Sequence, residues 1–213
     1  MQIPIYLARG EEELINKNKF LYFGSKRERV FRVLLSNKIK KFSWYKIAKL
    51  ADTNYSYVHS ILYELERLGV LKGHKILDVQ KIFSLWANHT YRRYYREYNI
   101  QNPKDILKNA KMEYAFTGYF AENLVGNYLF PRYYEIYVND YELEKWHDLL
   151  TNSGYVGKGN VKIISTDHHV FFEKYDVEGW PVVSIQQLIV DLLREGAECG
   201  EAGERLMKMI YHA

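Results

Sequence analysis

Polar side chains gather in one stretch of the sequence, NYSYVHSILYELERLGVLKGHK, at residues 54–75. Its apolar residues recur at helical spacing, so the polar residues fall together on the opposite face of a helix. Asparagine can pair with adenine, serine and histidine can contact base edges or phosphate, and lysine neutralises phosphate. An ordinary solvated helix face is the alternative. Contact with a nucleic acid would be made by Asn54, Tyr55, Ser56, Tyr57, His59, Ser60, Tyr63, Arg67, Lys72, His74 and Lys75.

Predicted helices and a hairpin would position these residues. The first helix opens at Ser25, with Glu28 in a capping-box pattern, and the second is capped by Ser43. The third helix spans residues 55–68 and stops at Gly69, and two short strands follow around Gly73. This order predicts a winged helix-turn-helix, whose third helix lies in the DNA major groove and whose hairpin touches phosphate. Winged helices also mediate protein contacts, so the fold alone does not settle the function.

The formal net charge of +4 hides an asymmetry between the two halves of the chain. Residues 1–111 hold 22 basic and 10 acidic side chains, a balance of +12. Residues 112–213 hold 8 basic and 16 acidic ones, a balance of −8. Such asymmetry favours two units with different partners, the first facing a polyanion. The alternatives are two domains with different surface charge, or a basic half docked on an acidic half.

A fourth helix is expected after the hairpin, from a cap at Asp78 through YRRYYREY at residues 91–98. Arg92 and Arg93 lie among tyrosines there, which suits a nucleic-acid backbone. A linker helix whose tyrosines pack between two domains is an equal alternative. Pro103 marks a boundary. The predicted organisation is an N-terminal extension at 1–24, a winged-helix domain at 25–77, a linker helix and boundary at 78–110, and an α/β domain at 111–213.

The second unit alternates strands and helices, so the expected fold class is α+β, a winged helix followed by a small mixed α/β domain. Nucleotidyltransferases hold metal and triphosphate with a strand, a glycine, a helix and a second strand that carries acidic residues. This chain has the same order, with Gly118 after the first strand and Glu135 on the second. Only one carboxylate stands where two are needed to hold Mg²⁺. We therefore expect a degenerate nucleotidyltransferase-like fold without catalysis. His168 and His169 are expected in a strand, on opposite faces, where they do not share a metal.

Cys199 is the single cysteine, which excludes a disulfide within the chain and a cysteine-based zinc site. The first residues contain no long apolar run, and no stretch approaches the span of about 18 apolar residues that crosses a membrane. We expect a cytoplasmic protein without membrane contact, and we expect no catalytic residue, cofactor or metal.

Three segments resemble the AbiEi family, the antitoxin and transcriptional-regulator components of type IV toxin–antitoxin systems. They are DVQKIFSLWANHTY after the hairpin, YAFTGYFAENL at the start of the second unit, and PVVSIQQLIVDLLREGAECGEAGERL near the end. The resemblance spans roughly residues 26–206, and the best match is the pattern of Ser184, Gln187, Asp191 and Leu192. The chain departs from the family in lacking an arginine within GAECGEAGE, and in having Val79 where the family usually has a proline.

The resemblance implies that the winged helix binds double-stranded DNA at its own promoter and represses it. The second domain would counter a toxin that resembles a nucleotidyltransferase, without requiring a stable complex with that toxin. The motif residues also have an ordinary structural explanation, which we favour over a functional one: Ser184 caps a helix, Gln187 and Asp191 hydrogen-bond within the domain, and Gly118 makes a tight turn. A palindromic promoter would call for a homodimer. Two other hypotheses remain: a nucleotidyltransferase-like enzyme tethered to a nucleic-acid-binding module, and a regulator whose second domain senses a ligand or a partner.

Overall fold

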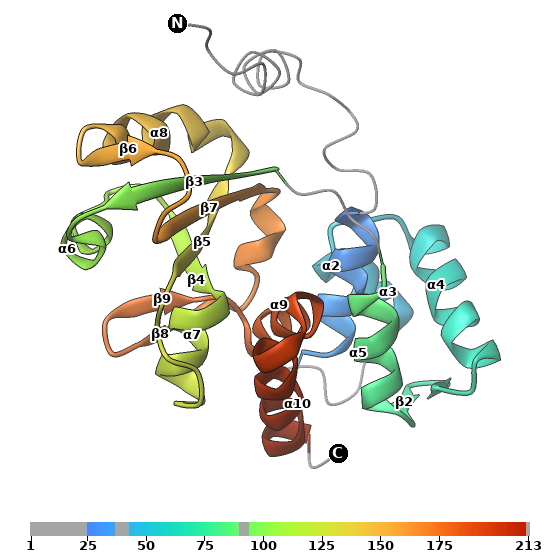
Figure 1. The fold of residues 1–213 in the computed structure, drawn as a ribbon. Helices are drawn as coiled ribbons and strands as arrows, with labels where there is room; N and C mark the ends of the chain where they lie inside the picture. The colour runs from blue at the N-terminus through green and yellow to red at the C-terminus, as the bar shows by residue number, and fades with distance from the viewer. Residues whose placement is uncertain (1–24, 37–42, 90–93, 212–213) are drawn as a thin grey trace, which may run out of the picture.

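The computed structural model describes residues 25–36, 43–89 and 94–211 (Figure 1). A helical segment at residues 25–89 lies beside a seven-stranded sheet, and the last two helices lie between them. This mixture of helices and strands confirms the predicted α+β class. Within the described ranges, no helix has both the length and the apolar character that crossing a bilayer demands.

The helical segment begins with three helices and a small hairpin, in the order predicted from the sequence. The helices are α2 (Ser25–Leu34), α3 (Trp44–Leu50) and α4 (Tyr55–Arg67), and the hairpin pairs β1 (Leu71–Lys72) with β2 (Lys75–Ile76) in antiparallel fashion. Each helix buries one side in a shared core and exposes the other, as the periodicity of its apolar residues requires.

Capping side chains fix where these helices begin. The Ser43 hydroxyl accepts the backbone N–H of Lys46 at 3.1 Å, and Asn54 caps α4 through its Oδ1 atom. Asp78 caps the next helix, α5 (Val79–Ala87). The predicted caps at Ser43 and Asp78 are confirmed, because each satisfies a backbone donor that has no partner within its own helix.

The prediction that the fourth helix continues to residue 98 is wrong. Helix α5 ends at Ala87, and residues 94–100 form strand β3 (Tyr94–Ile100). Side chains alternate along this strand: Tyr98 is buried on one face, and Tyr95 is 57% exposed on the other. The tyrosine-rich sequence therefore has a period of two, which fits a strand better than a helix. Arg92 and Arg93 lie outside the described residues.

Strands and helices then alternate to the end of the chain. Two short 3₁₀ helices, η1 (Asp140–Glu142) and η2 (His168–Phe171), interrupt the series. The prediction that His168 and His169 lie in a strand is wrong, because they open η2. The remaining elements are α6 (Pro103–Lys108), β4 (Tyr114–Thr117), α7 (Gly118–Val125), β5 (Tyr134–Asn139), α8 (Leu143–Thr151), β6 (Gly154–Val156), β7 (Val161–Thr166), β8 (Tyr175–Val177), β9 (Trp180–Val182), α9 (Ile185–Glu195) and α10 (Ala197–Tyr211).

The seven strands lie in the order β6-β3-β7-β5-β4-β9-β8. Strand β5 is antiparallel to β4 and parallel to β7, and β3 is antiparallel to both of its neighbours. Strands β8 and β9 are joined by a tight hairpin turn, in which Glu178 and Gly179 both have positive φ. Register places Glu135 of β5 beside both Thr117 of β4 and Lys162 of β7.

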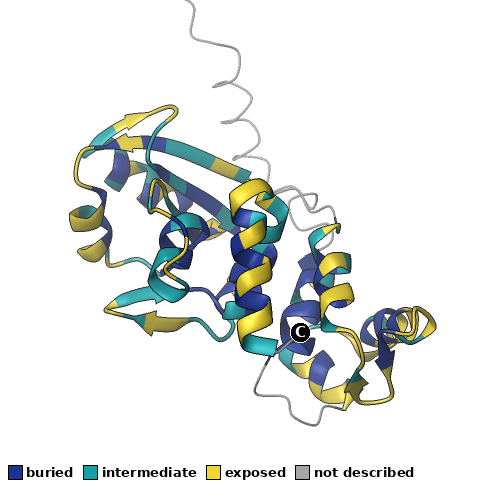
Figure 2. Cartoon of the chain, turned by 60° about the horizontal axis from the view of Figure 1, so that its bottom comes forward, coloured by how far each residue is buried: buried dark blue, intermediate teal, exposed yellow. Residues whose placement is uncertain are grey.

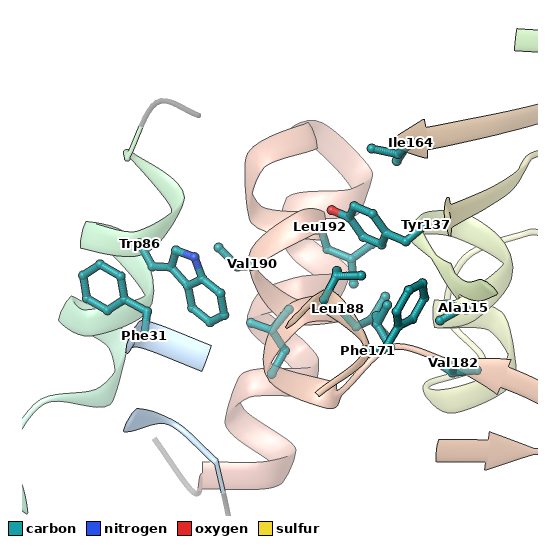
Figure 3. Packing of buried hydrophobic residues seen from close by; sticks show 14 of the residues in the cluster. Phe31, Trp86, Ala115, Tyr137, Ile164, Phe171, Val182, Leu188, Val190 and Leu192 are labelled. Carbon is teal, nitrogen blue, oxygen red and sulfur yellow. The ribbon is translucent and has the colours of Figure 1, made fainter. Parts of the chain in front are cut away.

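Helix α9 joins the helical segment to the sheet. Its Val190 faces Trp86 and Phe31 of the helical segment, whereas Leu188 faces the sheet side near Phe171 (Figure 3). All of these residues are buried and belong to one cluster, so a single apolar core runs through α9 from one part to the other. Exposed residues lie mainly on the outward sides of the helices and at the outer strands (Figure 2).

Candidate nucleic-acid interface and the network behind it

Three aromatic rings form a row along the exposed face of α4. The ring centroids of Tyr55 and His59 are 6.1 Å apart, and those of His59 and Tyr63 are 6.3 Å apart and nearly parallel at 12°. Tyr55 is 48% exposed and Tyr63 is 54% exposed. Trp44 of α3 packs its ring edge-on against His59 at 4.9 Å, which holds the middle of the row. Such a face offers flat apolar contact for thymine methyl groups and hydrogen-bonding atoms for base edges.

The other predicted contacts of α4 have different surroundings. Asn54 Oδ1 accepts the N–H of Tyr57 at 2.8 Å, so capping takes up one of the two acceptor positions of that oxygen. Tyr57 is half-buried, and burial raises the pKa of its phenol. The Ser60 hydroxyl donates to the Tyr57 carbonyl at 2.8 Å, whereas Ser56 is exposed in the first turn. Tyr55, Ser56, His59 and Tyr63 are thus the best placed of this set.

Two lysines oppose each other in the β1–β2 hairpin. Lys72 and Lys75 are cross-strand partners, both are exposed, and neither has an ion-pair partner within the described part of the chain. Like charges at opposed positions destabilise a hairpin, and a bound polyanion would relieve this repulsion. Glu66 of α4 accepts the N–H of Gly73 at 2.8 Å, so the hairpin is held against the end of the helix.

Further basic residues surround this face. Arg67 and His74, both predicted, are exposed at the end of α4 and in the hairpin turn. Lys46 and Lys49, which the sequence analysis did not single out, are exposed on α3. The two lysines are three residues apart, so they lie on one face of the first helix of the predicted helix-turn-helix. That spacing could have identified them from the sequence. Together with Lys72 and Lys75 they place positive charge on the elements that flank α4.

Behind α3 and α4, a buried arginine connects the helical segment to α9. Arg32 of α2 is 4% exposed and donates to Gln187 Oε1 from Nε at 3.0 Å and from Nη2 at 2.7 Å. Burial lowers the pKa of the guanidinium, although Glu28 and Asp167 nearby oppose that effect. A buried charge is tolerated only when its donors are satisfied, so this arginine fixes the relative position of the two parts.

His169 extends the same network to the end of α3. Arg32 Nη1 donates to His169 Nδ1 at 2.7 Å, because a guanidinium can only donate. His169 Nε2 therefore carries the proton and donates to the Leu50 carbonyl at 2.9 Å. Burial, together with the charge of Arg32, lowers the pKa of His169 to about 4, so the ring is neutral near pH 7. Leu50 is the last residue of α3, immediately before the turn into α4.

A second buried link starts from Glu28 of α2. The sequence predicted Glu28 only as part of a capping box, yet its carboxylate accepts from Trp86 Nε1 at 2.8 Å and from Arg194 Nη1 at 3.3 Å. Arg194 belongs to α9 and also donates to the carbonyl of Trp86 at 2.9 Å. No sequence signal pairs residues so far apart.

Residues of the AbiEi-like pattern lie in this network. Ser184 caps α9 through a hydrogen bond from the N–H of Gln187 at 3.3 Å. Gln187 Nε2 donates to Asp191 Oδ1 at 2.9 Å, and Thr117 Oγ1 donates to Asp191 Oδ2 at 2.8 Å. The expected hydrogen bonds within the second unit are therefore present, and Gln187 makes a further one to Arg32.

A pocket of about 150 Å³ lies between α9 and the sheet. Glu135, Lys162 and Ile164 form its sheet side, and Asp191 and Glu195 of α9 face them. Burial raises the pKa of Glu135, although Lys162 at 3.3 Å opposes the effect. Among the described residues, no group of three or more His, Cys, Asp or Glu side chains is arranged to hold a metal ion.

Gly118 forms the tight turn expected at the start of α7. Its φ is +62°, and a Cβ atom placed there would lie 1.6 Å from Glu135 Oε2. A side chain there would be strained, because the backbone is left-handed, and the end of the Glu135 side chain would have to move. The Glu135 carboxylate itself accepts a hydrogen bond from Lys162 Nζ at 3.3 Å.

No family model, curated protein or solved structure matches this chain. The resemblance to the AbiEi family thus remains a prediction from the sequence, and the geometry described above is the basis for assigning a function.

Proposed function

We propose that this protein is a cytoplasmic, DNA-binding transcriptional regulator, and that residues 25–77 form a winged helix-turn-helix. In this proposal α3 and α4 are the helix-turn-helix, α4 is the recognition helix, and β1–β2 is the wing. The observation that carries the proposal is the row of rings formed by Tyr55, His59 and Tyr63, beside the opposed pair Lys72 and Lys75. A face of this kind combines base readout with phosphate neutralisation.

We also propose that the sheet unit is a degenerate nucleotidyltransferase-like fold without catalysis. The order β4–α7–β5 followed by α8, β6 and β7, with β5 antiparallel to β4 and parallel to β7, supports this relation. The ion pair of Glu135 and Lys162 argues against a Mg²⁺ site, because the carboxylate already has a cationic partner.

The physiological role we propose is the autorepressing antitoxin of a type IV toxin–antitoxin pair, acting on a nucleotidyltransferase-like toxin. This part of the proposal derives from the sequence resemblance.

Salt-dependent DNA binding tests the regulator proposal. We would measure the dissociation constant of the purified protein for duplex DNA from upstream of its own coding sequence, at several salt concentrations. The slope of log affinity against log salt is about −0.9 for each phosphate neutralised. Lys72→Ala/Lys75→Ala should therefore weaken binding to all duplexes and reduce the slope by about 2.

A matched control removes the same charge elsewhere. Lys108 and Lys111 are exposed on and after α6, away from the proposed interface, so Lys108→Ala/Lys111→Ala should leave the slope nearly unchanged. Equal slopes for the two double variants would contradict the assignment of the wing. Absence of binding at low salt would contradict the regulator proposal itself.

A further inference from the structure

The turn between α3 and α4 contains a strained residue. Asp52 has a φ of +47°, in the left-handed region that residues other than glycine seldom adopt. A residue keeps this conformation only where its surroundings hold it there, and such positions cluster at functional sites. The turn fixes the angle between α3 and α4. Whatever holds Asp52 therefore also fixes the direction in which α4 presents its exposed face.

Arg29 of α2 holds this turn. Its Nη1 atom donates to Asp52 Oδ2 at 2.8 Å and to the Asp52 carbonyl at 3.3 Å. The side chain of Asp52 is 87% exposed, whereas that of Arg29 is only 18% exposed. An exposed ion pair contributes little stability by itself, so the position of Asp52 depends on how firmly the guanidinium is held.

The sheet unit holds the guanidinium of Arg29 through Asp167. Arg29 Nε donates to Asp167 Oδ2 at 3.3 Å, and the side chain of Asp167 is largely buried. Asp167 Oδ1 in turn accepts the backbone N–H of His169 at 2.9 Å, which caps η2. Because the guanidinium is planar, with donors in fixed directions, Asp167 and Asp52 are aligned through one side chain.

Helix η2 contacts the same turn a second time. His169 donates to the carbonyl of Leu50, the last residue of α3, and its ring stacks on Phe172 with 5.2 Å between the ring centroids. Other links between the two parts of the molecule end at α2 or directly after it, as Ser36 does with Glu173 Oε1 at 2.6 Å. Two contacts from η2 and its cap therefore converge on the turn that precedes α4.

We propose that Asp167 and His169 are positioning residues for α4, Asp167 through Arg29 and His169 through the carbonyl of Leu50. The sheet unit thereby sets the orientation of α4, and sequence discrimination by α4 requires it. Hydrogen bonds to base edges need a defined helix orientation, whereas phosphate contacts carry no sequence information. The effect on discrimination rests on the proposed DNA-binding function, and the positioning of α4 rests on the contacts alone.

The positioning of α4 is tested without DNA, from the indole N–H signals of the full chain in nuclear magnetic resonance spectra. Trp44 of α3 lies edge-on against His59 of α4, so its signal responds to the angle between the two helices. Asp167→Asn should displace the Trp44 signal, because asparagine still caps η2 but lacks the charge that aligns Arg29. Arg29→Gln breaks the same link from α2 and should displace the signal as well.

Tyr114→Phe is the matched control, because it also removes one buried hydrogen bond of the sheet unit and keeps the shape of the side chain. Tyr114 packs edge-on against Trp146, with 5.5 Å between the ring centroids, away from the turn. This variant should leave the Trp44 signal in place. An unmoved Trp44 signal in both Asp167→Asn and Arg29→Gln, or the same displacement in the control, would overturn the proposal.

Discrimination is tested with the upstream duplex and a scrambled duplex of the same composition. Asp167→Asn and Arg29→Gln should each lose about fivefold or more of the preference for the upstream duplex, roughly the contribution of one base contact. Their affinity for the scrambled duplex should change little, and Tyr114→Phe should keep the wild-type preference. A displaced Trp44 signal with an unaltered preference would overturn the role in discrimination. A wild type that binds no DNA would overturn the proposed function, and the Trp44 signal would still decide the positioning of α4.

Discussion

Replacing Arg32 should show how strongly the helical segment is tied to α9. Arg32→Met keeps the apolar stem of the side chain and removes the guanidinium. The change leaves Gln187 Oε1, His169 Nδ1 and the His169 carbonyl without their donor, and these acceptors are 2.7–3.1 Å from Arg32 nitrogens. Each buried group left unsatisfied costs about 1–3 kcal/mol, and relief from burying the charge offsets part of that sum. We expect a loss of about 3 kcal/mol in the free energy of unfolding.

The partner substitution completes a double-mutant cycle. Gln187→Leu leaves the Arg32 guanidinium buried with fewer acceptors, and we expect a loss of about 3 kcal/mol or more. In the double variant both ends are apolar, so the loss should be close to that of one single variant. The coupling energy should then be at least about 2 kcal/mol, within the range found for residues in one hydrogen-bonded network.

Urea denaturation followed by circular dichroism measures these values. Lys208→Met, at an exposed position on α10, is the control and should change the free energy of unfolding by less than about 0.5 kcal/mol. The reasoning would be refuted by an Arg32→Met variant as stable as the control, or by losses in the double variant that simply add.

Two further predictions use the same urea measurement, and a third uses amide hydrogen exchange. Burial lowers the pKa of His169 to about 4 from 6.5, so the unfolded chain binds a proton before the folded chain does as the pH falls. The free energy of unfolding should therefore decrease by roughly 2–3 kcal/mol between pH 6.5 and about 4. His169→Gln should flatten this pH dependence. Gly118→Ala should cost about 1–3 kcal/mol, mainly from the left-handed backbone, and a neutral result would contradict the turn geometry. Glu66→Ala should free the hairpin from α4 and speed amide exchange at Gly73, which unchanged protection would contradict.

Local signals in the sequence predicted much of the fold. Ser43, Asp78 and Ser184 were each identified as caps, because a polar side chain before an apolar-periodic run satisfies donors within its own helix. The order of helices and hairpin followed from these local features.

Features that depend on distant residues were missed. Strand β3 was taken for a helix because its tyrosines occupy both faces, and its partners β6 and β7 follow more than fifty residues later. The bonds from Arg32 to Gln187 and from Glu28 to Arg194 cross from α2 to α9, and no local pattern marks them. The exposed set on α4 was predicted from periodicity, whereas the occupied Oδ1 of Asn54 and the half-buried ring of Tyr57 required the three-dimensional arrangement.

The most direct test of the central claim is sequence discrimination by α4. We would compare the affinities of the wild type and His59→Ala/Tyr63→Ala for the upstream duplex and for a scrambled duplex of equal length and composition. If α4 reads bases, the wild type should prefer the upstream duplex, and the double variant should lose about tenfold or more of that preference while retaining its affinity for the scrambled duplex. Equal preference in the two proteins, or none in the wild type, would contradict the assignment of α4 as a recognition helix.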